Sequence, residues 1–231
     1  MPDSPPAAPG ILYVVATPLG NLEDLTLRAL RVLRDAFLIA CEDTRRTATL
    51  LRSYGIQTPT TSYFEHNERW KGERILDALR AGHDVALVSD AGTPGISDPG
   101  FPLIREALRE GVPVVPVPGP AAVTTALSAA GLPTHHFLFL GFPPPKATGL
   151  RKLLAARIDE EATLVFYLPT RRLAEFLEAV GEVLGDRRVV VARELTKVHE
   201  EFLRGTVTEL AAAIGSRALK GEATVLIEGA R

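Results

Sequence analysis

A glycine- and proline-rich segment, SDAGTPGISDPG at residues 89–100, separates an apolar run from a predicted helix. The apolar run at 84–88 predicts a buried strand, and residues 101–110 predict a helix. Glycine lets the backbone approach a ligand closely, and proline fixes the shape of a loop. In open α/β sheets, ligands bind in the crevice outside the carboxyl ends of the strands. The segment therefore predicts an α/β sheet with a small-molecule site at this strand end.

Strands and helices alternate through the first half of the chain. The predicted strands are 11–16, 37–41, 60–64, 85–88 and 112–117, and the first helix is 25–34 with Asp24 as its N-cap. This alternation is typical of a parallel sheet covered on both faces. Because the carboxyl ends of parallel strands share one edge, the polar and glycine-rich loops after four of these strands are expected to converge.

Pro118, Gly119 and Pro120 interrupt the alternation and predict a joint between domains. Beyond it come predicted helices at 121–130 and 146–157, further helices ending at 184 and 214, and four strands. We therefore expect a disordered tail at 1–10, a parallel α/β domain at 11–117 and a second α/β domain at 118–231, with a cleft between the two domains. The predicted fold class is α/β.

Composition excludes several classes of protein. The net charge of -2 gives no global indication of nucleic-acid or membrane binding. Cys41 is the only cysteine, which excludes a disulfide framework, and it lies in an apolar run that predicts a buried thiol. The histidines show no metal-ligand spacing, so no metal site is expected. No apolar run approaches the roughly 18 residues of a membrane span, and no signal peptide is evident, so we expect a soluble cytoplasmic protein.

Two polar clusters follow predicted strands. The first is EDTRR at 42–46, whose carboxylates and guanidiniums could orient a hydroxyl or clamp a phosphate. The alternative is a helix start at which acidic residues favour the positive end of the helix dipole. The second is His66 with Asn67, where histidine could take a proton and asparagine could bind a base or ribose. The alternative there is a solvated or structural loop.

Two further segments are rich in charge. A basic helix carries Lys146, Arg151, Lys152 and Arg157, and could contact a phosphate backbone together with the basic residues at 45–52 and 69–74. The alternative is a solvated helix face. A dense polar run at 193–201 contains Lys197 and Glu201 and follows an apolar strand. It could face the cleft, or it could be an exposed hairpin.

Five segments occur in the order of a known family: VVATPLGNL at 14–22, CEDTR at 41–45, SDAGTPGISDPG at 89–100, VPGP at 117–120 and ELTK at 194–197. With them the chain resembles the tetrapyrrole-methylase-like (class III) methyltransferases. Within that family it is similar to the subgroup of ribosomal RNA small subunit methyltransferase I enzymes. The resemblance extends from about residue 11 to residue 228, which is nearly the whole chain.

The resemblance implies a 2′-O-ribose methyltransferase that uses S-adenosylmethionine and acts on a cytidine in the decoding region of 16S rRNA, in the 30S subunit. It also implies two α/β domains with the cofactor in the cleft between them, and a homodimer. The family's cofactor positions correspond to Pro18, Leu19, Gly20, Asp90, Ala91, Gly92, Thr93, Ile96, Pro118, Gly119, Pro120, Ala121, Leu140 and Gly141.

Clustering at strand ends, together with the resemblance, gives a hypothesis for catalysis. Asp43 or His66 would orient or accept the proton of the ribose hydroxyl, Arg45 would hold phosphate, and Asn67 would read the nucleotide. Lys197 and Glu201 are second-rank candidates. Many subgroup members have YESPHR where this chain has YLPTRR at 167–172. This departure removes a carboxylate and a histidine, so only Arg171 or Arg172 is left in that loop to contact substrate.

Two alternatives compete with this interpretation. One is a tetrapyrrole methyltransferase of the same fold, acting on a precorrin-type substrate. The first loop is TPLG at 17–20 rather than a GxGxG-like sequence, and the basic segments favour RNA, so both features disfavour a tetrapyrrole. The other alternative is a non-catalytic module that binds the ribosome or an adenosyl ligand.

Overall fold

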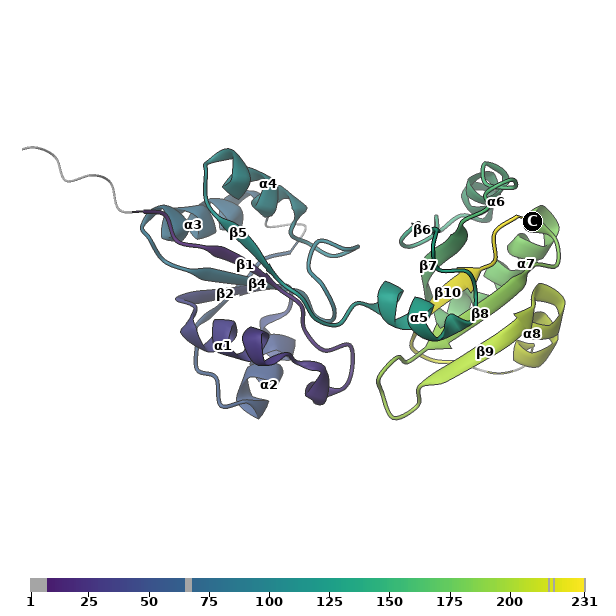
Figure 1. Cartoon of the computed structure of the whole chain (residues 1–231), viewed down its shortest axis with the longest axis horizontal. Helices are drawn as coiled ribbons and strands as arrows, with labels where there is room; N and C mark the ends of the chain where they lie inside the picture. Colours follow the sequence, from purple (N-terminus) through teal and green to yellow (C-terminus); the bar gives the residue numbers. More distant parts are fainter. Residues whose placement is uncertain (1–7, 65–67, 216, 218, 231) are drawn as a thin grey trace, which may run out of the picture. The chain divides into compact units, whose positions relative to one another are not determined.

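The computed structural model describes residues 8–64, 68–215, 217 and 219–230. The chain divides into two compact units, Met1–Ala121 and Ala122–Arg231, which are described separately (Figure 1). The boundary predicted from the sequence lies four residues earlier, after residue 117. Of the tail expected at 1–10, Gly10 is buried and donates its N–H to the Leu79 carbonyl at 2.8 Å, and residues 1–7 lie outside the described residues.

Unit 1 is built on a five-stranded sheet. Its strands are β1 (Leu12–Val15), β2 (Leu38–Cys41), β3 (Thr60–Ser62), β4 (Val85–Val88) and β5 (Val114–Val117). The order across the sheet is β3-β2-β4-β1-β5, and every neighbouring pair is parallel. All five carboxyl ends therefore lie at one edge, named here the carboxyl edge.

Helices cover both faces of this sheet. α1 (Leu27–Asp35) and α2 (Thr44–Ser53) lie on one face, and α3 (Glu68–Arg80) and α4 (Phe101–Arg109) on the other (Figure 1). Successive β4 side chains enter opposite cores, with Ala86 and Val88 on the α1–α2 side and Val85 and Leu87 on the α3–α4 side. Burial on both faces explains why β4 is a continuous apolar run.

The first helix begins later than the sequence predicted. Asp24 ends a short 3-10 helix, η1 (Leu22–Asp24), and Leu25 then adopts an extended backbone. α1 then starts at Leu27. Its N-cap is Thr26, whose side chain accepts the N–H of Ala29 at 3.1 Å. The prediction of Asp24 as N-cap was therefore wrong, because the extended Leu25 ends one helical turn and Thr26 caps the next.

An ion-pair network joins the last turns of α3 and α4. Arg80 contacts Glu73 and Asp77 at 2.7 Å each, and Glu110 at 2.5 Å. Each of these helices follows a strand of the parallel sheet, so each begins at the carboxyl edge. The network therefore lies at the opposite end of the helices from the candidate site.

Strand β5 forms one edge of the sheet and contains Pro116. The carbonyls of Pro113 and Val117 accept hydrogen bonds from Leu12 and Ala16 of the neighbouring chain segment. Pro116 lies at the alternate register and is exposed, and its carbonyl accepts a 3.1 Å hydrogen bond from Arg28 Nη2. Proline is tolerated here because an edge strand need not donate on its outer side.

Unit 2 contains a mixed sheet. Its strands are β6 (Phe137–Phe139), β7 (Thr163–Pro169), β8 (Arg188–Arg193), β9 (Glu201–Thr206) and β10 (Glu222–Ile227), in the order β6-β7-β10-β8-β9. Only β6 and β7 are parallel, and the other three pairs are antiparallel. β8 and β9 form a hairpin, so the polar run at 193–201 is the turn of a hairpin, which was the alternative considered above.

Helices complete the second unit. They are α5 (Ala122–Ala130), α6 (Ala147–Ala155), the 3-10 helix η2 (Thr170–Arg172), α7 (Leu173–Leu184) and α8 (Val207–Ile214). α6, α7 and α8 share one core with β7, β8 and β10, in which the rings of Phe166 and Phe176 meet edge to face at 5.1 Å. α5 packs on β8 and β10. No helix in the described ranges is long and apolar enough to cross a membrane.

Candidate functional site

The loops after β1 and β4 are joined at the carboxyl edge of unit 1. Thr17 and Gly92 exchange two backbone hydrogen bonds, of 2.8 and 2.9 Å, in an antiparallel bridge. The buried Thr17 hydroxyl also donates to the Ser89 carbonyl at 3.1 Å. Two strands that are neighbours in the sheet therefore remain paired beyond their ends, which fixes both loops.

Gly92 is the point at which three loops meet. Its φ of +86° lies in the left-handed region, and a Cβ there would lie 3.3 Å from Leu19 Cδ2 and 3.8 Å from the Pro120 carbonyl oxygen. The hydroxyl of Thr93 also donates to the Pro120 carbonyl, at 3.1 Å. The loops after β1, β4 and β5 thus form one assembly that we name the glycine cradle, defined by residues 16–20, 89–96 and 118–121.

The remainder of the 89–100 loop is held in an unusual backbone conformation. Ser97 has a φ of 63°, and Gly95 and Gly100 also have positive φ values. A Cβ on Gly100 would lie 3.1 Å from Leu87 Cδ2, so the close return of the chain requires glycine there. Ile96, the last cradle residue of this loop, is 44% exposed, which makes an apolar contact available to a ligand.

Asp90 links the loops after β2 and β4. Its Oδ1 accepts the backbone N–H of Asp43 at 3.1 Å, and its Oδ2 lies 3.1 Å from Arg46 Nη1. Asp43 in turn caps α2, accepting the Arg45 N–H at 2.8 Å, and pairs through Oδ2 with Arg45 Nη2 at 2.9 Å. The cluster therefore stands beside the glycine cradle on a fourth strand end.

The carboxyl groups of this cluster differ in proton affinity. Hydrogen bonds from Arg45 lower the pKa of Asp43 to about 2. Burial, followed by the charge of Asp90, raises the pKa of Glu42 above its usual value. At neutral pH Asp43 is thus ionised and already engaged, whereas Glu42 holds a proton more readily.

The expected cofactor residues of unit 1 lie in the glycine cradle. They are Pro18, Leu19 and Gly20 after β1, Asp90, Ala91, Gly92, Thr93 and Ile96 after β4, and Pro118, Gly119, Pro120 and Ala121 after β5. Leu140 and Gly141 follow β6 in unit 2. His66 and Asn67 lie outside the described residues. The assignment of these residues to a cofactor or substrate stays a prediction.

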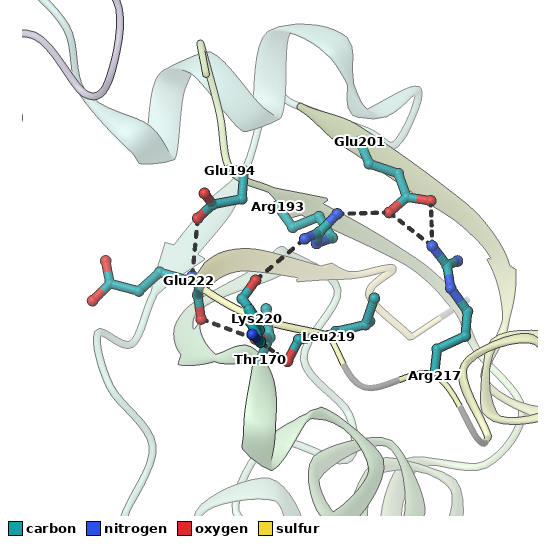
Figure 2. A network of polar contacts seen from close by, with 9 residues as sticks. Thr170, Arg193, Glu194, Glu201, Arg217, Leu219, Lys220 and Glu222 are labelled. Atoms are coloured by element: carbon teal, nitrogen blue, oxygen red, sulfur yellow. Dashed lines mark hydrogen bonds and ion pairs between the residues drawn. The ribbon is translucent and has the colours of Figure 1, made fainter. Parts of the chain in front are cut away.

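Glu201 and Lys197 belong to unit 2, at the β8–β9 hairpin. Glu201 contacts Arg193 and Arg217, each at 3.0 Å (Figure 2). Arg193 also donates to the Lys220 carbonyl at 3.2 Å. Lys197 pairs with Glu194 at 3.1 Å. These contacts give Glu201 a structural part in joining β8, β9 and the segment before β10, and its suggested catalytic role stays a prediction.

Glu201→Gln is expected to lower the free energy of unfolding by about 1 kcal/mol at pH 7, because Arg193 and Arg217 lose their common carboxylate. These two arginines hold the pKa of Glu201 below its ordinary value of 4.5. A lowered pKa contributes stability above the unfolded value, and that contribution disappears as pH falls through the folded value. Urea unfolding should therefore separate the two proteins at pH 7, and the difference should shrink as pH falls below the ordinary value of 4.5.

Glu182→Gln is the matched control, since its pair with Arg151 is more exposed, at 47% and 40% for the two side chains. It should change stability less than Glu201→Gln. A stability difference for Glu201→Gln that persisted unchanged at acidic pH would contradict the assigned role of the carboxylate.

Several arginines of unit 2 bind carboxylates or backbone carbonyls within the same unit. On α6, Arg151 pairs with Glu182 at 2.6 Å. The predicted basic helix ends at Ala155 rather than at 157, so Arg157 lies in the turn beyond it and donates to the Leu153 carbonyl. Arg172 donates to the carbonyls of residues 143–145 and so holds the loop that follows Gly141. Arg171 or Arg172 was predicted to contact substrate. Because the guanidinium of Arg172 is bound to these carbonyls, Arg172 holds the 143–145 loop in place. The three consecutive prolines at 143–145 marked this loop in the sequence.

Comparison with known proteins gives a consistent result. Residues 11–211 match the family described as Tetrapyrrole (Corrin/Porphyrin) Methylases. Proteins named Ribosomal RNA small subunit methyltransferase I are similar along most of the chain. One from Pseudomonas aeruginosa is 51% identical, covering 95% of this chain and 79% of its own. One from Thermotoga maritima is 46% identical, covering 95% and 99%.

Solved structures share the fold at lower identity. A cobalt precorrin-4 methyltransferase superposes with a TM-score of 0.70 at 20% identity, covering 94% of each chain. A uroporphyrin-III-C-methyltransferase from Thermus thermophilus superposes with a TM-score of 0.66 at 24% identity, covering 95% of this chain and 94% of its own. These likenesses confirm the predicted α/β fold class.

Proposed function

This chain belongs to the tetrapyrrole methylase family, and from that premise we propose that it methylates the ribose 2′-oxygen of a cytidine in the decoding region of 16S rRNA. Relatives named for small-subunit rRNA methylation, 45–51% identical over nearly the whole chain, support RNA as the substrate class. The observation that carries the proposal is the glycine cradle, where three loops meet at Gly92 beside a cluster of charged groups.

The glycine cradle fits S-adenosylmethionine. Gly92 and Gly119 bring bare backbone to the carboxyl edge, where a Cβ would meet Leu19 and Ala16, respectively, at 3.3 and 3.0 Å. Leu19 and Ile96 offer apolar contact to an adenine ring, and the loop backbone offers hydrogen-bonding groups. Leu140 and Gly141 join the proposed cofactor residues through the family resemblance. When bound, the cofactor supplies a methyl group on an already activated sulfonium.

The remaining task of the protein is to position the ribose and remove its hydroxyl proton. We assign the proton to Asp43 or His66, phosphate contact to Arg45 and nucleotide contact to Asn67. Arg45 is well placed for this, because its side chain is 88% exposed although it is paired with Asp43. Glu42, with its raised pKa, is a further acceptor to test. The substrate in this proposal is the 30S subunit, and the enzyme is a homodimer.

The decisive assay supplies tritium-labelled S-adenosylmethionine and 30S subunits that lack their native decoding-region methylation. After digestion of the RNA, label is expected in 2′-O-methylcytidine derivatives. A parallel incubation contains a precorrin-type compound in place of the 30S subunits. Label in that compound alone would replace the RNA proposal with a tetrapyrrole substrate. Cofactor binding without transfer to either substrate would indicate a binding module.

A further inference from the structure

The first turns of α3 and α4 each present an exposed aromatic ring with cations beside it. Trp70 is 55% exposed, and Phe101 is 61% exposed. Lys71 Nζ lies 4.7 Å from the centroid of the Trp70 ring, and Arg74 Cζ lies 5.3 Å from it. Arg105 Cζ lies 5.2 Å from the centroid of Phe101. We name these five residues the aromatic–cation surface.

This surface adjoins the candidate site. α3 and α4 pack together on one face of the sheet, where Ile75 and Leu79 share a core with Leu103. The ion pair between Arg80 and Glu110 joins their far ends, and both helices begin at the carboxyl edge of the sheet. Phe101 directly follows the 89–100 loop, which contributes Gly92 and Ile96 to the glycine cradle. The aromatic–cation surface and the glycine cradle therefore belong to the same edge of unit 1.

Charge is distributed unevenly along the two helices. The carboxylates of Glu73, Asp77 and Glu110 all pair with Arg80, in the last turn of α3. At the near end, Lys71, Arg74 and Arg105 form no ion pair with any described residue. Lys71 instead donates to the Thr61 hydroxyl at 3.0 Å, which orients its side chain beside Trp70. These three cations are therefore not neutralised by an ion pair among the described residues, although the whole chain carries a net charge of -2.

We propose that Trp70 and Phe101 stack on unpaired bases of the RNA substrate while Lys71, Arg74 and Arg105 contact the neighbouring phosphates. Aromatic side chains with basic neighbours bind single strands, because every base offers a stacking face and every linkage offers a negative charge. Duplex bases are already stacked and cannot use such rings. The inference rests on the proposed function in taking RNA as the substrate.

A second copy of this chain fits the aromatic–cation surface less well. In a symmetric pair each copy would present the same patch to the other, and three uncompensated cations would face three more. RNA phosphates complement that charge instead. We therefore commit to single-stranded RNA as the occupant.

Tryptophan fluorescence tests this proposal directly, because Trp70 is the only tryptophan of the chain. An unlabelled single-stranded RNA of about 12 nucleotides should quench the emission of the full-length protein, and a duplex of equal length should quench it much less. Phe101→Ala keeps the reporter and should weaken single-strand affinity about tenfold. Leu108→Ala, on the far turn of α4, is the matched control and should leave affinity unchanged; Leu108 is 59% exposed.

Salt dependence separates the cations from the rings. Arg74→Gln and Arg105→Gln should each reduce the slope of log affinity against log salt by about 0.7, whereas Phe101→Ala should leave the slope unchanged. Absence of quenching by single-stranded RNA, or equal affinity of Phe101→Ala and the wild type, would overturn the proposal. So would a loss of self-association in Phe101→Ala, measured by sedimentation, with RNA affinity unaltered.

These measurements need no methyl transfer, so their failure is distinct from failure of the proposed function. Labelled 2′-O-methylcytidine together with an unquenched Trp70 would refute the stacking surface alone. Quenching without any transfer to 30S subunits would leave the surface standing and refute the proposed reaction.

Discussion

Valine in place of Gly92 is expected to lower S-adenosylmethionine affinity by at least about 100-fold, equivalent to about 2.7 kcal/mol. Two physical effects combine. The left-handed φ of +86° is strained for a β-branched residue, and the added carbons would enter the space between Leu19 and the Pro120 carbonyl. Titration calorimetry of the purified variant with the cofactor measures the loss, and normal binding would place the cofactor elsewhere.

Gly111→Val is the matched control for backbone strain. Gly111 also has a positive φ, +75°, but a Cβ there would meet nothing within 4 Å, and the residue precedes β5 at the opposite edge of the sheet. Both variants should lose stability in urea unfolding through backbone strain, and Gly92→Val should lose more because its side chain also meets Leu19. Only Gly92→Val should lose the cofactor, so equal loss in both variants would point to general damage to the fold.

Asp43→Asn is expected to reduce the single-turnover rate of methyl transfer about 100-fold, with cofactor affinity unchanged. Asparagine still caps a helix well, so the substitution removes the charge of Asp43 while α2 keeps its start. The bond from the Asp43 N–H to Asp90 belongs to the backbone and is also retained. Rapid-quench measurement with 30S subunits isolates the chemical step from substrate release.

Glu42→Gln is the informative partner of that variant, because the two carboxyl groups are adjacent but differ in pKa. With its pKa of about 2, Asp43 is ionised throughout the neutral range, so a rate that depends on it stays flat with pH there. An acceptor at Glu42 would instead make the rate rise with pH above the ordinary value of 4.5. An unchanged rate in Asp43→Asn, with a fall in Glu42→Gln, would transfer the role to Glu42.

Much of unit 1 could be predicted from the sequence. The strand at 85–88 is buried on both faces, so its apolar run coincides with β4. The loop at 89–100 could be identified because its conformation requires glycine. Gly92, Gly95 and Gly100 have positive φ values, so the requirement appears in the sequence as a run rich in glycine. Helix starts were harder to place, since several residues near the start of α1 could cap a helix and the choice of Thr26 depended on the conformation of Leu25.

Unit 2 was harder to predict because its sheet is mixed. Strand β9 is half-buried and carries Arg204 and Glu201, so it shows no clear apolar alternation, and its pairing with β8 is a tertiary property. β10 pairs antiparallel with β7 and β8, and the sequences of these strands do not show whether they run parallel or antiparallel.

Within the candidate site, the sequence located residues but not their contacts. Asp90 was expected beside a cofactor, yet its two oxygens hold the backbone of Asp43 and the side chain of Arg46. Glu201 was a second-rank candidate for catalysis, and the structure surrounds it with Arg193 and Arg217. Ion-pair partners such as Arg217 are distant in sequence, so no local pattern could have revealed them.

Pro116 has a consequence for how copies of this protein can assemble. Outward-facing N–H groups on an edge strand are a template on which another chain can add a strand and begin aggregation. Two residues of β5, Val114 and Pro116, lie at the outward register; Pro116 has no N–H, and Arg28 already occupies its carbonyl. A strand added across this edge would therefore find no hydrogen-bonding group free at Pro116, which interrupts its ladder and makes open-ended sheet growth there unfavourable.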